Sequence, residues 1–503
     1  MRITNCIKQI LGALIIASLS ACGGGGGGSD NNDSTAAKLS NGEITNFGSV
    51  FVNGVEYNTD TAVFIVDDFV VGGVDTDNFN IGMRVKVKGS VNPDGVTGIA
   101  TSVEFDDLLE GPVNGAASED ADGLINTLTV LGIPVLVDKD GTSFLNTSYD
   151  DLATTSPDGK VLKISGFFDA SNQLHAVFIE KKSDTFTAPA DEVELKGVIT
   201  AVGANTFELN YSGNATVTVN TNIGTDLTEL PGGVVQGTYV EVEGTIPDKA
   251  TATITANKIE FEDNEFGGDG QDIEFEGIVT RFVSLSDFDV EGVTVNAGTA
   301  VTIPANITTL IVGDKVEVEG TTVGTVIQAV KLKKRSGRYK IHALVSAVTT
   351  TSFSLEPVSG GNTITVTVDT STEMEDKVGV LGSSYGIGNV DIGHFLQVRG
   401  FADGDPATAR SILATRVRRE SVDDVILEGV IQSFTANTDV TVLGVAFPVV
   451  TATTEYQDQN NDPIIESLFD TNTTNGQSVV KIKDRESGGD LTPGLADTVE
   501  IQS

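Results

Sequence analysis

The hydrophobic and polar residues of this chain alternate in short runs, and one run recurs at a near-constant interval. Its fullest form is Val240-Glu241-Val242-Glu243-Gly244, which places two valines on one face of a strand and two glutamates on the other. We expect the glycine to make a turn after the strand. The run returns every 76 to 84 residues, ending at Gly89, Gly166, Gly244, Gly320, Gly400 and, in a weaker form, Asp484. Such a period predicts one supersecondary unit copied about six times.

The residues around each run predict further short strands. Asn53-Gly54 between valines is typical of a two-residue hairpin turn, and related turns stand at 131–132, 291–292 and 443–444. Val, Ile, Thr and Phe dominate, and helical spacing is nearly absent except near 148–152 and 465–469. We predict an all-β chain, a tandem array of small antiparallel OB-like barrels, because closure removes exposed edge strands. An open sandwich is the alternative.

The pattern also predicts how the chain is divided. The expected parts are a signal peptide at 1–21, a Gly/Asn/Asp-rich tether at 22–41, and copies at 42–107, 108–182, 192–263, 273–335, 339–420 and 425–503, the last divergent. We expect bead-like barrels joined by acidic linkers such as 183–191 and 263–272. A unit of this size buries only about 60% of its unfolded surface, so contact between neighbouring copies would stabilise each one.

The N-terminus has the features of an export signal. Arg2 and Lys8 precede a short apolar run at 11–19, which is too short to span a bilayer. Leu19-Ser20-Ala21-Cys22 resembles the lipobox of bacterial lipoproteins. That resemblance implies cleavage before Cys22, acylation of this cysteine and, since no acidic retention signal follows it, lipid anchoring in the outer membrane. An ordinary secretory signal with an incidental cysteine is the alternative.

Composition narrows the classes of partner. The cysteines are Cys6, within the signal, and Cys22, so the mature chain has no thiol for a disulfide or a thiolate metal site. The formal net charge of −40 repels phosphate backbones and argues against nucleic acid as a partner. Basic residues gather at 331–340 and 416–419, and we expect these strands to point their charges outward and to pair with neighbouring acidic copies.

No catalytic set stands out in the sequence. His175, His342 and His394 are far apart and lie in unlike contexts, which argues against a histidine-ligated zinc or a Ser-His-Asp triad. Carboxylates are abundant, but no pair is distinguished from the acidic background. We therefore predict that the protein is not an enzyme, with a hydrolase of envelope polysaccharide as an alternative.

Some acidic turns have the oxygen ligands that calcium prefers, at every second residue. These calcium candidates are Asp138, Asp140, Asp458, Asn460 and Asp462. However, Pro463 stands where an EF-hand loop needs glycine, and Phe469 replaces the bidentate glutamate. We therefore expect no cofactor, and a calcium-stabilised surface adhesin is the alternative.

Several of these motifs together resemble a known repeat. Phe51-Val52-Asn53-Gly54-Val55, the Val-x-Val-x-Gly run and Ala256-Asn257-Lys258-Ile259-Glu260-Phe261 are similar to the DUF5666 repeat, a domain of unknown function found in bacterial lipoproteins, often after a Cys-Gly-rich start like 22–28. The resemblance covers nearly all of the chain after Asn41 and is strongest in copies one and three. It carries no catalytic motif, so it supports the architecture and the cell address only. From the lipobox, the sixfold β repeat and the missing catalytic set we predict a membrane-anchored envelope lipoprotein with a non-enzymatic binding or structural role.

Overall fold

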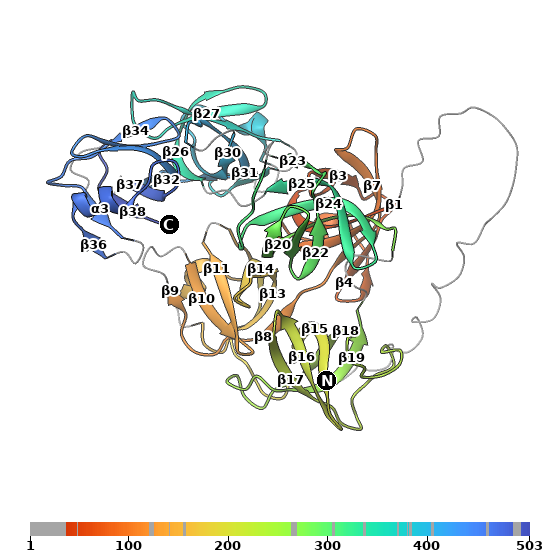
Figure 1. Cartoon of the computed structure of the whole chain (residues 1–503). Coiled ribbons are helices and arrows are strands. Elements are labelled where there is room, and N and C mark those ends of the chain that lie inside the picture. The colour runs from red at the N-terminus through yellow and green to blue at the C-terminus, as the bar shows by residue number, and fades with distance from the viewer. Residues whose placement is uncertain are drawn as a thin grey trace, which may run out of the picture. The chain divides into compact units, whose positions relative to one another are not determined.

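The structure, a computed structural model, describes residues 37–502 except 48, 120–124, 140, 154–156, 263–268, 304–306, 335–338, 370–371, 380, 382–384, 404–406, 459–461 and 486–493. The predicted signal peptide, Cys22 and most of the predicted tether lie outside the described residues. Within the described ranges, six successive copies of one β unit follow one another (Figure 1). No helix in these ranges has both the length and the apolar character needed to cross a bilayer.

The first three copies hold the elements up to residue 261. Copy one contains β1 (Ala37–Asn46), β2 (Val50–Val52), β3 (Val55–Asn58), β4 (Val63–Val66), β5 (Phe69–Val71), α1 (Asp75–Asn78), β6 (Arg84–Val91) and β7 (Thr97–Phe105). Copy two contains β8 (Leu109–Pro112), β9 (Ser118–Glu119), β10 (Ile125–Val130), β11 (Ile133–Asp138), β12 (Ser143–Leu145), α2 (Tyr149–Ala153), β13 (Val161–Phe168) and β14 (Leu174–Ser183). Copy three contains β15 (Val193–Val202), β16 (Thr206–Ser212), β17 (Ala215–Asn220), β18 (Tyr239–Thr245) and β19 (Ile254–Phe261).

The last three copies repeat this order. Copy four contains β20 (Asp272–Ser284), β21 (Asp287–Val290), β22 (Val293–Asn296), β23 (Val301–Ile303), β24 (Lys315–Val323) and β25 (Val326–Lys334). Copy five contains β26 (Tyr339–Val348), β27 (Ser352–Glu356), β28 (Ile364–Thr367), β29 (Glu373–Asp376), η1 (Ile387–Asn389), β30 (Phe395–Ala402) and β31 (Ser411–Glu420). Copy six contains β32 (Val425–Thr435), β33 (Asp439–Val442), β34 (Val445–Pro448), β35 (Glu455–Gln457), β36 (Pro463–Ile464), α3 (Glu466–Asn472), β37 (Val479–Asp484) and β38 (Thr498–Ile501).

Copy four shows how a barrel closes. Its first strand, β20, pairs antiparallel with both β21 and β24. β21 pairs with β22, β24 pairs with β25, and β22 runs parallel to β25. The circuit β20-β21-β22-β25-β24 therefore returns to its start as a five-stranded barrel, and copies one, three and five close through the same pairings. This confirms the predicted all-β fold of OB-like barrels over an open sandwich.

The valines of the recurring run form the barrel interiors. Val240 and Val242 of copy three and their counterparts Val316 and Val318 of copy four are fully buried. One continuous apolar cluster runs through copies two and three, and another runs through copies five and six. The cluster of copy four also takes in Leu39 of copy one, and the cluster of copy one takes in Phe178 of copy two.

The predicted hairpin turns are confirmed. Asn53 and Gly54 have φ of 53° and 81°, and Glu291 and Gly292 have φ of 51° and 80°. Two successive positive φ values match the right-handed twist of the flanking strands, which is why glycine is favoured at the second position. The predicted short helical segments near 148–152 and 465–469 are α2 and α3.

The recurring glycine does not end its strand, contrary to our expectation. β18 continues to Thr245, and its register against β19 shifts between Glu243 and Gly244, so the glycine lies in a β-bulge. A Cβ at Gly244 would stand 2.5 Å from the carbonyl oxygen of Thr255. Equivalent shifts and close approaches occur at Gly89, Gly166, Gly320 and Gly400. Glycine recurs here because the partner backbone leaves no room for a side chain.

The barrels are not separate beads, which corrects a second expectation. The first strands of the copies pair with one another: β1 with β20, β8 with β15, and β26 with β32. Copy one therefore pairs with copy four rather than with its sequence neighbour. β1 also begins at Ala37, inside the stretch expected to be tether, because Lys38 to Asn41 pair with Asp272 to Phe275 of β20.

Candidate functional site

Charged side chains on the strand faces that point away from the barrel interiors are buried as well. The alternation of the recurring run predicts that these faces meet solvent, yet Glu241 is 5% exposed and Glu317 only 1%. Other charged residues of this kind are Lys163, Lys196, Glu260, Glu274, Glu276, Lys340, Arg416 and Arg418. A buried charge is costly unless it has a partner, so these residues must pair with one another. The junctions between barrels are therefore the candidate functional sites.

The most charged junction is formed by copies one, two and three. The β4–β5 hairpin turns through Asp67 and Asp68, which both have positive φ, and the Asp67 amide donates to the Phe105 carbonyl at the end of β7. Asp106 and Asp107 follow directly. The amide of Leu108 then donates to β13 and its carbonyl accepts from β15. Two Asp-Asp pairs are thereby held against copies two and three.

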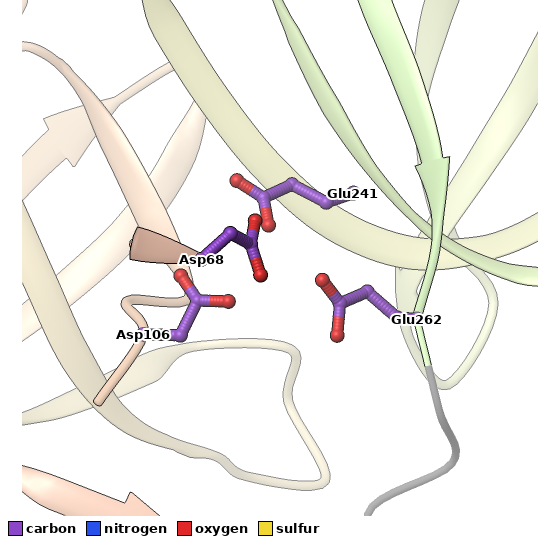
Figure 2. A group of neighbouring side chains, drawn as sticks. All are labelled: Asp68, Asp106, Glu241 and Glu262. Carbon is purple, nitrogen blue, oxygen red and sulfur yellow. The ribbon is translucent and has the colours of Figure 1, made fainter. Parts of the chain in front are cut away.

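One group of carboxylates surrounds Lys196 of β15. Figure 2 shows Asp68 and Asp106 of copy one pointing toward Glu241 and Glu262 of copy three. One oxygen from each lies within 4.8 Å of the others. The ammonium of Lys196 lies 2.9 Å from both Glu241 Oε2 and Glu262 Oε1, and it also contacts Asp106. We call these five residues the Lys196 cluster.

A second group surrounds Lys163 of β13. Its Nζ lies 2.7 Å from Asp67 Oδ1 and 2.8 Å from Asp107 Oδ1. The carboxylates of Glu110 on β8 and Glu194 on β15 are farther away, at 3.9 and 4.0 Å. We call these five residues the Lys163 cluster. The Lys196 cluster therefore joins copies one and three, and the Lys163 cluster joins copies one, two and three, each through a buried lysine.

Burial dominates the electrostatics of the two clusters. Desolvation raises the pKa of Asp106 to about 7 and that of Glu241 to about 10, although Lys196 opposes both shifts. It likewise raises the pKa of Glu110 to about 7 and that of Glu194 to about 9, helped by the charge of Asp107. For the Lys196 ammonium, burial lowers the pKa, but the surrounding carboxylates outweigh it and the net shift is upward. Lys196 therefore remains charged, while the carboxylates with raised pKa values take up protons more readily than ordinary acids do.

A small cavity borders both clusters. Its volume of about 60 Å³ suffices for a few water molecules but is far below the roughly 300–1,000 Å³ of a small-molecule pocket. Ser165, 3% exposed, lines it, and its hydroxyl has no hydrogen-bond partner in the described part of the chain. The other lining residues are Asn41, Arg84, Val85, Lys86, Glu104, Asp106, Asp107, Leu108, Gly166, Lys196, Tyr239 and Glu262.

The junction of copies one and four is built in a similar way. Lys38 Nζ of copy one lies 2.9 Å from Glu274 and 2.8 Å from Glu319 of copy four. In the opposite direction, Lys315 of copy four contacts Glu43 of copy one. Ion pairs thus cross this junction both ways.

A ring from copy two meets the same junction. The Phe167 ring of β13 lies 4.8 Å from the guanidinium carbon of Arg84 and 4.8 Å from the ammonium of Lys315. Phe167 is 1% exposed and packs with Val177 and Ile278. A cation–π contact on a desolvated ring stabilises by about 2 kcal/mol, so this ring connects copy two to copies one and four.

The calcium candidates of the sequence lie elsewhere. Asp138 ends β11, and both its carboxylate oxygens lie 3.0 Å from Arg399 Nη2 of copy five. Asp458 Oδ1 accepts a hydrogen bond from the amide of Asp462. Among the described residues, neither loop forms a convergent group of three acidic ligands. Asp140 and Asn460 lie outside the described residues.

The basic residues are paired, but mostly within their own copies. Lys331 and Lys334 lie 3.6 and 2.6 Å from Glu319 and Asp314 of copy four. Arg416 and Arg418 lie 3.1 and 3.2 Å from Glu373 and Glu375 of copy five. These ion pairs lie within one copy, and in copy five the acids come from β29, which runs parallel to β31. Arg418 also reaches a neighbouring copy, because its Nη1 donates to the carbonyl of Lys139 in copy two. Arg335 and Arg338 lie outside the described residues.

Comparison with known protein families finds a match for three of the six copies. A family model described as a domain of unknown function (DUF5666) matches residues 110–180, 196–260 and 342–418. The chain contains DUF5666 domains in these three regions. The matched regions fall in copies two, three and five, whereas the sequence resemblance extends over nearly the whole chain and is strongest in copies one and three. The search of curated proteins found no match to this chain.

The two lysine-centred clusters were missed by the sequence reasoning. Lys163 sits in the recurring run of copy two, and Lys196 directly precedes Gly197 in the first strand of copy three. Sister copies have other charged or polar residues at both positions, so periodicity gave no reason to single out either lysine. The two Asp-Asp pairs, Asp67-Asp68 and Asp106-Asp107, were the one sequence feature that could have pointed to these clusters. Each lies at a strand end, where an acidic pair is ordinarily solvated.

Proposed function

We propose that this DUF5666-repeat protein is a bacterial outer-membrane lipoprotein, anchored through Cys22, with a non-catalytic structural or binding role. The observation that supports the scaffold part is the direct pairing of first strands between copies, β1 with β20, β8 with β15 and β26 with β32. Backbone ladders backed by buried ion pairs join the barrels into assemblies, which suits a spacer or a platform that presents loops.

The anchor is tested by replacing the proposed lipidated cysteine. Cys22→Ser removes the acyl acceptor, and we expect the protein to move from the membrane pellet to the soluble fraction and to lose label from radioactive palmitate. Cys6→Ser is the matched control, since it removes a thiol from the expected signal peptide and should change neither result. If the Cys22→Ser protein stays in the membrane pellet, the anchor is wrong.

The non-catalytic part has its own support. The carboxylates brought together at the junctions hold lysines rather than facing an open cleft, and the adjoining cavity is too small for a sugar ring. The purified chain should therefore release no product from peptidoglycan or capsular and exopolysaccharides. Hydrolysis that exceeds the blank and is lost in Glu262→Gln would contradict this and place a hydrolytic site at the Lys196 cluster.

A further inference from the structure

Copies one and four have the same barrel end next to the point where the chain enters copy one. β1 of copy one and β20 of copy four run parallel, with Lys38 opposite Asp272. β6 and β24 each run antiparallel to the first strand of their own copy. The β6–β7 and β24–β25 hairpins therefore turn at the same end of the two barrels, where β1 begins at Ala37. We call this end the tether end.

Three aliphatic side chains are exposed at the tether end. Val96, in the β6–β7 turn, is 41% exposed, and Val323, at the end of β24, is 54% exposed. Ile99 of β7 is 49% exposed and pairs with Ser90, which in turn pairs with Ala37. We call Val96, Ile99 and Val323 the tether-end surface, to which both copies contribute.

Exposure alone does not select a partner, because the opposite end of copy four is apolar as well. Ile311 and Val312 are 46% and 51% exposed, and the amide of the next residue, Gly313, donates to the carbonyl of Val279. Val279 lies in β20, and subtracting 272 from 279 places it seven residues after Asp272. Seven strand residues span about 23 Å, so the two ends of this barrel are well separated.

The tether end differs from the opposite end in its distance from the proposed lipid anchor. Ala37 stands 15 positions after Cys22 along the chain. Fully extended, that many residues span about 50 Å, and a Gly-rich chain of this length has a root-mean-square end-to-end distance of about 20 Å. A short linker of this kind gives a local concentration in the millimolar range, so a contact too weak to hold a free protein becomes occupied.

We propose, on the basis of the proposed lipidation of Cys22, that the tether-end surface rests on the lipid bilayer. Aliphatic side chains gain free energy when they leave water for the boundary between headgroups and acyl chains. The formal net charge of −40 makes an anionic lipid surface unfavourable, so the expected partner is a zwitterionic phospholipid. Copies one and four then stand on the membrane by this end, and the opposite end of copy four faces away from it.

A single tryptophan reports which end meets lipid, because this chain has none. Val323→Trp and Val312→Trp place one at each end of copy four, at sites of nearly equal exposure. The lipidated full-length variants are bound to preformed phosphatidylcholine vesicles with and without brominated acyl chains, since bromine quenches tryptophan on contact. Val323→Trp should lose about half of its emission, because interfacial side chains lie about 5–10 Å into the headgroup and acyl boundary. Val312→Trp should lose none.

A second set of variants shows whether apolar contact causes the quenching. In the Val323→Trp protein, Val96→Ser/Ile99→Ser should reduce the quenching, because the other two side chains of the surface no longer favour the lipid boundary. Ile311→Ser, at the opposite end, is the matched control and should leave the quenching unchanged. All of these substitutions replace exposed residues, and unchanged melting midpoints show that the variants are folded.

Palmitate labelling separates the failure of this contact from the failure of the anchor. If Cys22 is labelled but Val323→Trp is not quenched, the anchor stands and the tether-end surface does not meet lipid. Equal quenching of Val312→Trp overturns the proposal too, because neither end is then preferred on the bilayer. Quenching that persists in full after Val96→Ser/Ile99→Ser does the same. If Cys22 takes no label, the anchor and this contact are both wrong.

Discussion

The interior of a barrel and the junction between barrels are the two faces of the same strands, and they are buried by different means. In β18, Val240 and Val242 face an apolar interior, while Glu241 between them is 5% exposed and lies 2.9 Å from Lys196. The interior is stabilised by the removal of apolar surface from water. The junction is stabilised by ion pairs that offset the cost of desolvating charge. A charged residue on a strand therefore does not identify a solvent face in a repeat whose barrels pair.

Removing one buried ammonium should give the largest effect. Lys196→Met leaves Asp106, Glu241 and Glu262 without their shared cation, and breaking a buried pair in this way costs about 3–5 kcal/mol. Lys331→Met is the matched control, because Lys331 has 34% side-chain exposure and pairs with Glu319 at 3.6 Å, for which about 0–1 kcal/mol is expected. Urea unfolding followed by circular dichroism measures both. Equal losses would mean that the junctions are solvated and the barrels are independent beads.

An intermediate effect is expected from the barrel wall. Gly244→Ala places a methyl group 2.5 Å from the Thr255 carbonyl oxygen, and relief of that overlap requires the bulge to open. Overpacking of this kind costs about 1–3 kcal/mol. Gly72→Ala is the control, since Gly72 has no atom within 4 Å of its Cβ position and should leave the unfolding midpoint unchanged. If Gly244→Ala is as harmless as Gly72→Ala, the recurring glycine serves as a flexible turn, as its sequence pattern suggests, and not as a close contact.

The sequence predicted the barrel interior much better than the junction. Alternation of valine with polar residues shows which side chains enter an interior, and Asn53-Gly54 indicates a hairpin, because both are local physical constraints. Which barrel meets which is decided by contacts between residues more than two hundred positions apart, such as Lys38 with Glu274. No periodic signal encodes that choice. The two lysine-centred clusters went unpredicted for the same reason, since Lys196 resembles any outward-facing charge until copy one packs against it.

The smallest expected effect is a dependence of stability on pH, which arises at the junction of copies one and four. It distinguishes the junction from the apolar barrel interior, because the junction contains the groups that titrate. Glu274 is 2% exposed, and desolvation raises its pKa from 4.5 to about 8, with Glu317 adding to the shift and Lys38 and Lys333 opposing it. Between these two values the folded protein holds a proton that the unfolded chain has released, so stability falls as pH rises from about 4.5 to about 8.

Glu274→Gln isolates this contribution, because glutamine resembles the protonated acid at every pH. Relative to the wild type, the variant should gain stability between pH 6.5 and 7.5, by on the order of 1 kcal/mol for a single proton over one pH unit. Val318→Ala, in the apolar interior of the same barrel, is the matched control and should lower stability by a constant amount across this range, since no titrating group is removed. Melting midpoints of the three proteins, measured from pH 6 to 9, give the comparison. Parallel curves for Glu274→Gln and Val318→Ala would show that Glu274 is ionised throughout, and that the ion pair with Lys38 rather than burial controls this junction.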